Sequence, residues 1–214
     1  MPRLRLLSIA SALTISAVQA QTLEGLYLQL QLAGSSFQHV HYYFWKDGRI
    51  CRGLATGGIA LEPADFGAYQ TAVQKQQGEC GQYSISGKTM HLHWPAGRSY
   101  DASFVNFKDG SFEMNQYTTA HVAFNPGQKI DGTYSATVVG KQMRIQRYVF
   151  HTDRTYELSD KPVTSMDGQP KSAVGTYRVY GSTLELTGSS GVTRLTAYPF
   201  PDGGIDIEGT VFSK

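Results

Sequence analysis

The stretch GQYSISGKTMHLHW, residues 81–94, has a close counterpart in GTYRVYGSTLELTG, residues 175–188. Both read Gly-x-Tyr-x-x-x-Gly and then alternate apolar and polar residues. Other landmarks match in the same order. Gly25-Leu-Tyr corresponds to Gly132-Thr-Tyr, Phe44 and Phe150 follow at nearly equal distances, and an Asp-Gly pair stands near the end of each segment. Matched landmarks at matched spacing predict an internal repeat.

The two predicted copies occupy residues 21–124 and 125–214, joined by the turn-rich stretch AFNPGQK. The first copy is longer between its Phe44 landmark and its Gly-x-Tyr motif. The additional residues, 62–77, have the composition of a short helix or an ordered loop. A long loop on a rigid β-scaffold is a common place for binding residues, so we expect function to reside in the first copy.

Residues 1–20 have the pattern of a secretory signal peptide. Arg3 and Arg5 precede a short apolar run, and small residues surround Gln19 before an expected cleavage after Ala20. We therefore expect an exported protein, periplasmic or extracellular. No later stretch is long and apolar enough to predict a transmembrane segment.

Charge excludes one class of partner. Without the leader's two arginines, the 19 Lys and Arg become 17, against 17 Asp and Glu. Nucleic-acid binding usually requires a clustered positive excess, which this composition lacks. The balance gives no support for a polyanion or an anionic membrane as partner either.

The chain has two cysteines, Cys51 and Cys80. In an exported chain an even number favours a disulfide, whereas two buried thiols are the alternative. Closing a loop of this length contributes roughly 3–4 kcal/mol in the chain-entropy model.

The remainder of the sequence indicates β-structure. Segments such as LYLQLQL, KTMHLHW and GIDIEGTVF alternate with a period of two, and Asp-Gly turn signals separate them. Each copy offers about seven short strands. We predict an all-β fold, an antiparallel up-and-down β-barrel or sandwich built from two internal repeats, with a short helical or loop insertion in the first.

The pattern G-x-Y, F-x-x-D-G-R, G-x-Y-x-x-x-G, L-x-L, D-G resembles the small lipocalin-like (calycin) domains of exported bacterial proteins. The resemblance covers nearly all of both copies and includes no catalytic motif. It implies an up-and-down barrel that binds a small or apolar ligand at its mouth or presents a surface to a partner. The duplication and the long insertion depart from the family pattern.

The SGKT of the opening stretch is not a phosphate-binding loop. That motif needs a glycine at position 82, which is Gln82, and a helix after the lysine. Here Gly87, Lys88 and Thr89 precede an alternating segment, and the second copy has no lysine at this place. A tight turn between two strands is predicted.

The histidines form two H-x-H pairs, His39 with His41 and His91 with His93. On a strand each pair shares one face, so two neighbouring pairs could bind zinc, copper or nickel. The repeat aligns the second pair with Glu185 and Thr187, which alternate with leucines. We therefore predict exposed strand residues and no metal site.

Aromatic residues supply the candidate ligand contacts: Trp45, Trp94, Tyr43 and Tyr100. The two tryptophans align with His151 and Gly188, so the scaffold itself does not require them. Phe44 and Tyr83 have aromatic counterparts in Phe150 and Tyr177, which predicts that these residues belong to the core.

No G-x-S-x-G or H-E-x-x-H motif is present, and carboxylates such as Asp47, Asp65, Asp101 and Glu113 form no recognisable acid/base pair. We expect no enzyme, no cofactor and a monomer. The predicted function is an exported, non-catalytic binding protein for a small or apolar ligand. The alternatives are a periplasmic inhibitor or protein-interaction module and, third, a metal-binding protein built on the H-x-H pairs.

Overall fold

A computed structural model describes residues 22–214 except 35, 58–63, 141 and 165–168. The predicted signal peptide lies outside these residues. The described part is all-β apart from one α-helix and a short 3-10 helix, and it forms two antiparallel eight-stranded units, which confirms the predicted fold class. No helix within the described ranges is long and apolar enough to cross a membrane.

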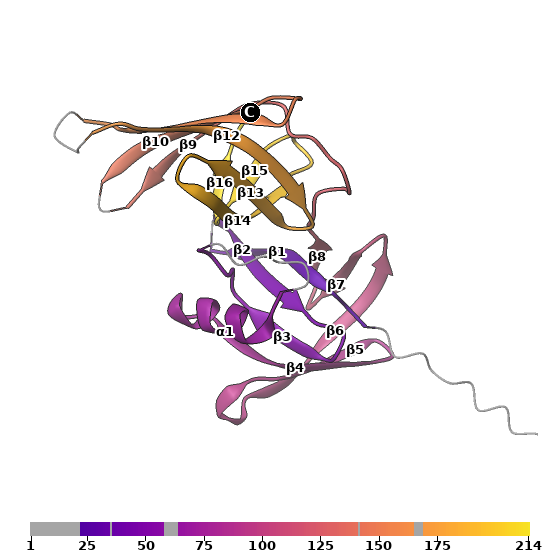
Figure 1. The fold of residues 1–214 in the computed structure, drawn as a ribbon. Helices are drawn as coiled ribbons and strands as arrows, with labels where there is room; N and C mark the ends of the chain where they lie inside the picture. The colour runs from indigo at the N-terminus through magenta and orange to yellow at the C-terminus, as the bar shows by residue number, and fades with distance from the viewer. Residues whose placement is uncertain (1–21, 35, 58–63, 141, 165–168) are drawn as a thin grey trace, which may run out of the picture.

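The first repeat forms a closed barrel in which the strands pair in sequence order (Figure 1). The 3-10 helix Pro95–Gly97 connects the fifth and sixth strands. The strands are β1 (Gly25–Ala33), β2 (Ser36–Phe44), β3 (Arg49–Arg52), β4 (Glu79–Ser86), β5 (Thr89–His93), β6 (Ser99–Lys108), β7 (Ser111–Met114) and β8 (Tyr117–His121).

The second repeat forms an eight-stranded sheet whose two outer strands meet at one bridge. Ser135 and Ser213 exchange two backbone hydrogen bonds of 2.9 and 3.1 Å, which bring the sheet into barrel form. The strands are β9 (Gly132–Val139), β10 (Met143–Phe150), β11 (Thr155–Pro162), β12 (Lys171–Tyr180), β13 (Thr183–Gly188), β14 (Gly191–Pro199), β15 (Ile205–Ile207) and β16 (Thr210–Phe212). Each repeat thus has eight strands where the sequence predicted about seven.

The repeat landmarks occupy equivalent positions in the two sheets. Gly25 pairs with Phe44 at the start of the first hairpin, and Gly132 pairs with Phe150 in the second. Because strand side chains alternate between faces, one set of large residues from each repeat points inward and is buried there. The first core contains Tyr42, Phe44, Ile50, Tyr83, Met90, Leu92, Trp94, Phe104 and Phe112, and the second contains Tyr134, Tyr148, Phe150, Tyr177, Leu184, Ile205 and Phe212.

The tyrosine of each Gly-x-Tyr-x-x-x-Gly motif closes one end of its barrel. The Tyr83 hydroxyl accepts a hydrogen bond from the Leu23 amide at 2.9 Å and donates toward the carbonyls of Leu23 and Trp45. The Tyr177 hydroxyl makes the same contacts to Ile130 and His151. The buried backbone that enters each first strand is satisfied by this tyrosine.

The two glycines of the motif are required for two different reasons, close backbone approach at the first and a positive φ at the second. A Cβ at Gly81 would lie 2.2 Å from the carbonyl oxygen of His93, and one at Gly175 would lie 2.0 Å from that of Thr187. Gly87 adopts a φ of +59° in the turn between β4 and β5. The residues that suggested a phosphate loop therefore form a hairpin turn, as predicted.

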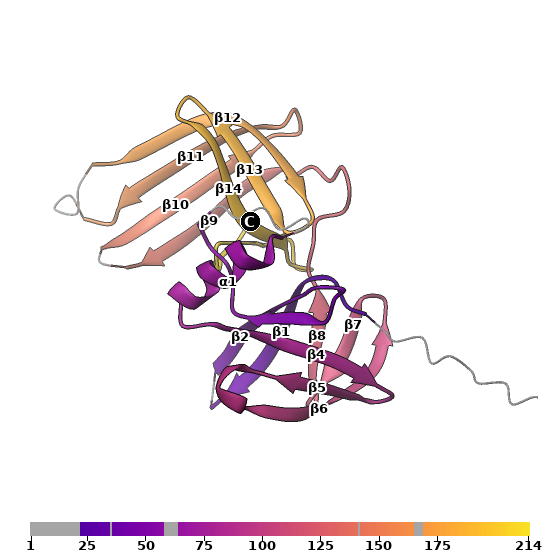
Figure 2. The ribbon, with the colours of Figure 1, turned by 60° about the horizontal axis from the view of Figure 1, so that its bottom comes forward.

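The two barrels share a third apolar cluster. Tyr198 of β14 packs against residues on the outer face of the first barrel and on the helix α1 (Phe66–Lys75). Phe200 packs beside it. Figure 2 shows α1 lying between the two barrels. The cluster comprises Leu26, Leu28, Tyr43, Trp45, Cys51, Leu54, Ala55, Ala64, Tyr69, Val73, Cys80 and Tyr198.

Candidate functional site

The described part of the predicted insertion, residues 64–77, consists mainly of the helix α1, which begins after Asp65. The Asp65 side chain accepts a hydrogen bond from the Ala68 amide at 2.8 Å and so caps the first turn. Tyr69 and Val73, four residues apart, share the face that is buried against the first barrel. The helix is thus an ordered part of the first repeat.

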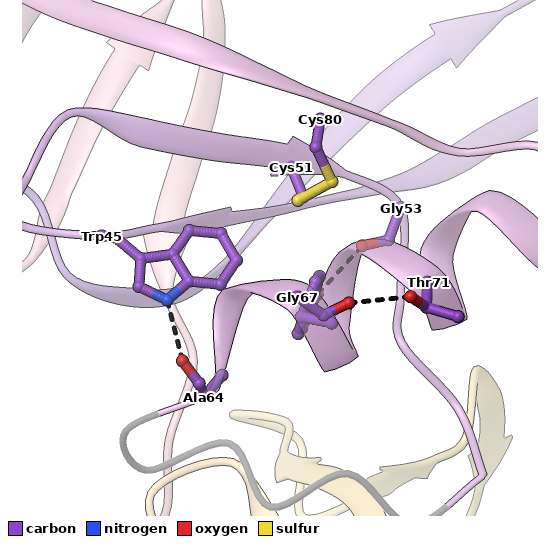
Figure 3. The surroundings of a disulfide bond; sticks show 8 residues. Trp45, Cys51, Gly53, Ala64, Gly67, Thr71 and Cys80 are labelled. Atoms are coloured by element: carbon purple, nitrogen blue, oxygen red, sulfur yellow. Dashed lines mark hydrogen bonds between the residues drawn. A yellow bond between two sulfur atoms is a disulfide. The ribbon is translucent and has the colours of Figure 1, made fainter.

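A disulfide anchors the base of the insertion (Figure 3). Cys51 and Cys80 are direct partners in neighbouring strands, with α-carbons 3.9 Å apart, so the predicted disulfide is confirmed. Nearby, the Trp45 indole donates a hydrogen bond to the Ala64 carbonyl at 2.9 Å, and the Tyr69 hydroxyl donates to the Gly53 carbonyl at 3.1 Å. These bonds hold the helix just before its first residue and along its buried face.

Two glycines allow the chain to leave and re-enter the barrel beside this disulfide. Gly53 has a φ of +125°, and a Cβ there would lie 3.1 Å from Val73. A Cβ at Gly78 would lie 2.3 Å from the same side chain and 2.6 Å from the Arg52 carbonyl. Val73 therefore packs directly on the two glycines, and β3 ends after four residues.

The early end of β3 leaves a hollow at one end of the first barrel, here called the rim groove. In the second repeat the equivalent strand, β11, continues to Pro162 along β10. The rim groove has a volume of about 380 Å³. It is lined by His39, Val40, His41, Arg52, Gly53, Leu54, Gln76, Gln77, Gly78 and Glu79.

The rim groove combines one free cation with polar and apolar walls. Arg52 is exposed and forms no ion pair with any described residue. Glu79, its partner across the strands, forms its ion pair with Arg98. Val40 packs against the core of the first barrel, whereas Leu54 is buried in the cluster that the two barrels share.

One residue that lines the rim groove, His41, also takes part in the contact between the two repeats. The Nε2 atom of His41 lies 2.7 Å from the Tyr198 hydroxyl, and the imidazole is only 8% exposed. Burial lowers the pKa of His41 to about 4, with a smaller contribution from His39. The imidazole is therefore neutral at physiological pH.

Behind Tyr198 lies a buried carboxylate. Asp206 is the direct partner of Tyr198 across β14 and β15 and is fully buried. Its Oδ1 atom accepts a hydrogen bond from the Gly209 amide at 2.8 Å, whereas no hydrogen bond of normal geometry from a described residue reaches its Oδ2 atom. The Gly209 amide and the neighbouring Tyr198 hydroxyl favour the ionised carboxylate, but burial outweighs them. Burial raises the pKa of Asp206 to about 6.

The candidate ligand contacts Trp45, Tyr43, Trp94 and Tyr100 occupy three different places. Tyr43 and Trp45 are buried together between the barrel and α1, with ring centroids 4.4 Å apart. Trp94 is buried in the core of the first barrel. Tyr100 is 44% exposed on β6. The structure thus brings two of the four together, and neither of these lines the rim groove.

The two H-x-H pairs lie on strands β2 and β5, which β3 and β4 separate. His91 contacts Asp101 at 2.7 Å, and His93 contacts Ser99. His41 corrects the expectation of exposed histidines, because the second repeat covers it. Among the described residues, no group of three or more His, Cys, Asp or Glu could hold a metal ion.

The four carboxylates considered for acid/base chemistry each have a local partner. Asp47 bonds Arg49 in the turn after β2, and Asp65 caps α1. Asp101 contacts His91, and Glu113 accepts a hydrogen bond from Asn106 at 2.8 Å. The four thus lie in four separate places rather than around one centre.

Sequence reasoning missed Arg52 and did not single out Gln76 and Gln77, although these two end the predicted insertion, residues 62–77. The only signal for Arg52 was its place after Cys51, where the repeat alignment begins to break. Comparison of the chain with protein-family models, with curated proteins and with solved structures found no match in any of the three.

Proposed function

We propose that this protein is an exported, non-catalytic, lipocalin-like binding protein that takes a small ligand in the rim groove of its first barrel. The observation that carries the proposal is Arg52, an exposed guanidinium without an ion pair to a described residue, beside the apolar Val40 and Leu54. Ligand pockets typically combine apolar walls with a few polar groups, and their volumes begin near ~300 Å³.

The barrel interiors are less suitable places for a ligand. Large side chains fill the first interior, and aromatic contacts link Phe44 to Tyr27, Tyr83 and Phe112 with ring centroids 5.0–6.3 Å apart. The rim groove, in contrast, is open to solvent and bordered by an ordered helix. A site that is already rigid loses little conformational entropy when a ligand binds.

The chemistry of the rim groove favours a small molecule with one anionic group and a short apolar part. Arg52 would bind a carboxylate or phosphate through its forked N–H donors. The side-chain amides of Gln76 and Gln77 would orient neutral polar groups. Glu79, already paired with Arg98, disfavours a ligand with several negative charges.

The test begins with native mass spectrometry of protein purified from its source, which would reveal a retained small molecule. Thermal unfolding with short-chain carboxylates and the matching alcohols then tests the anionic contact. We expect stabilisation by a carboxylate and not by its alcohol, lost in Arg52→Gln and kept in Arg154→Gln, which removes an exposed arginine elsewhere. Equal stabilisation of both variants would contradict a site at Arg52.

A further inference from the structure

The outer face of β9, β10 and β11 carries an exposed apolar row at its far end. Val139 ends β9, Met143 begins β10 and Val163 directly follows β11. The three lie side by side, since Val139 pairs with Met143 and the Val163 amide bonds the Met143 carbonyl at 3.0 Å. Their exposures are 75%, 47% and 47%. Ile145, two residues along β10 on the same face, is 48% exposed.

Two cations follow the apolar row on the same face. Lys161 is the partner of Ile145, and Arg147 lies two residues further along β10. Neither forms an ion pair with a described residue, and Arg147 makes only a long contact of 3.5 Å to the Thr133 hydroxyl. Backbone rise places Lys161 about 7 Å and Arg147 about 13 Å behind the row.

These cations border a hollow of about 220 Å³ on the outer face. The hydroxyls of Ser159 and Ser172, partners of each other across β11 and β12, line it between the cations and Val174. Glu157 stands at the end farthest from the apolar row, beside His151 at 3.6 Å. Among the described residues on this face, the charges nearest the row are therefore the cations Lys161 and Arg147, and the one carboxylate that lines the hollow is remote from it.

We propose that this end of the second repeat docks on an anionic phospholipid surface. The apolar row would enter the boundary between headgroups and acyl chains, where interfacial segments bury their apolar side chains about 5–10 Å deep. At that depth Lys161 reaches the level of the lipid phosphates, and the hollow between Arg147, Ser159 and Ser172 accepts a headgroup.

The shape of the molecule permits this approach. In Figure 1 and Figure 2 the strands β9 to β12 run together to an end that projects away from the first barrel. The rim groove lies on the other repeat, so docking leaves it open. The balanced overall charge gave no support for such a surface, because composition does not show which side chains share one face of one sheet.

Binding is expected to be weak, reversible and sensitive to salt. Each Lys or Arg near an anionic surface strengthens binding about fivefold, and screening removes most of that gain within a Debye length. Four partly exposed apolar side chains add a contribution that salt does not remove.

The experiment is co-sedimentation of the full protein with two kinds of vesicle, pure phosphatidylcholine and phosphatidylcholine mixed with phosphatidylglycerol. Wild type should sediment with the anionic vesicles at low salt and release at high salt. Lys161→Gln with Arg147→Gln should weaken binding by more than tenfold, and Met143→Ser with Ile145→Ser should also weaken it. Leu30→Ser with Leu32→Ser, exposed leucines of the first repeat, is the matched control and should bind like wild type.

Three results would overturn the proposal. Equal sedimentation with both vesicles would show that the cations have no part in it. If the wild type does not sediment with vesicles but binds inorganic phosphate in calorimetry, and the Arg147→Gln with Lys161→Gln variant does not bind it, the hollow is a site for a free anion. If the wild type does not sediment with vesicles but is a dimer, and Met143→Ser makes it a monomer, a second copy of the chain covers the apolar row.

Discussion

Replacing Asp206 by Asn is expected to stabilise the protein at neutral pH. The carboxylate is fully buried, and no hydrogen bond of normal geometry from a described residue reaches one of its oxygens, so burial makes its ionised form unfavourable in the folded state. Its pKa rises from 3.8 to about 6, and a shift of about 2 units corresponds to about 3 kcal/mol. Asn is neutral and keeps a carbonyl oxygen for the Gly209 amide.

The effect should depend on pH in a defined window. Because the folded pKa of Asp206 is raised, the stability linked to its protonation is fully present below about 3.8 and is lost as the pH rises through about 6. His41 acts in the opposite sense. Its folded pKa of about 4 lies below 6.5, so its contribution is present above about 6.5 and is lost as the pH falls toward 4.

In the wild type the two contributions nearly cancel between pH 4 and pH 6.5. Asp206→Asn removes one of them. The variant should therefore exceed the wild type by up to about 3 kcal/mol in unfolding free energy above pH 6.5, with a difference that shrinks to zero near pH 3.8. Its own stability should fall as His41 becomes protonated in the unfolded chain.

The assay is urea unfolding followed by circular dichroism at several pH values from 4 to 8. The matched control is Asp202→Asn, because Asp202 is exposed and also accepts a backbone hydrogen bond, from Gly204 at 3.0 Å. That variant should show no comparable gain. A less stable Asp206→Asn at pH 8, or a gain that does not shrink on acidification, would refute the reasoning.

Three further substitutions test the scaffold. Cys51→Ala with Cys80→Ala should lower the unfolding free energy in urea by about 3–4 kcal/mol, and an unchanged midpoint would argue against a stabilising disulfide. Gly81→Ala should cost about 3 kcal/mol or more, because its Cβ would meet a backbone oxygen at 2.2 Å; a melting temperature like that of wild type would contradict this close approach. Tyr83→Phe should cost about 1–3 kcal/mol in thermal unfolding, since buried backbone groups lose their partner, and a neutral result would mean that water replaces the hydroxyl.

The sequence alone predicted the repeat, the all-β fold and most of the strand pattern of each copy, but it left barrel and sandwich open. Alternating residues define which side chains enter a barrel, and glycines at matched positions define where strands turn or approach closely, so Gly81, Gly87 and Tyr83 had structural meaning before any coordinates. The disulfide was also predictable, because an even number of cysteines in a chain with a predicted signal peptide favours pairing. The alternation and the matched glycines depend on local backbone geometry, and that geometry determines which residue types recur at regular intervals in the sequence.

The tertiary structure decided how the outer faces are used. The sequence predicted exposed histidines on the strands, and only the packing of Tyr198 against His41, in one cluster with Tyr43 and α1, showed that this outer face of the first barrel is buried. The rim groove likewise exists because β3 ends at Arg52 while β11 continues. The two barrels contact each other through surfaces whose residues lie far apart in the sequence. Unlike strand alternation, the fit between such surfaces leaves no repeating pattern in the sequence, so it cannot be read from the chain alone.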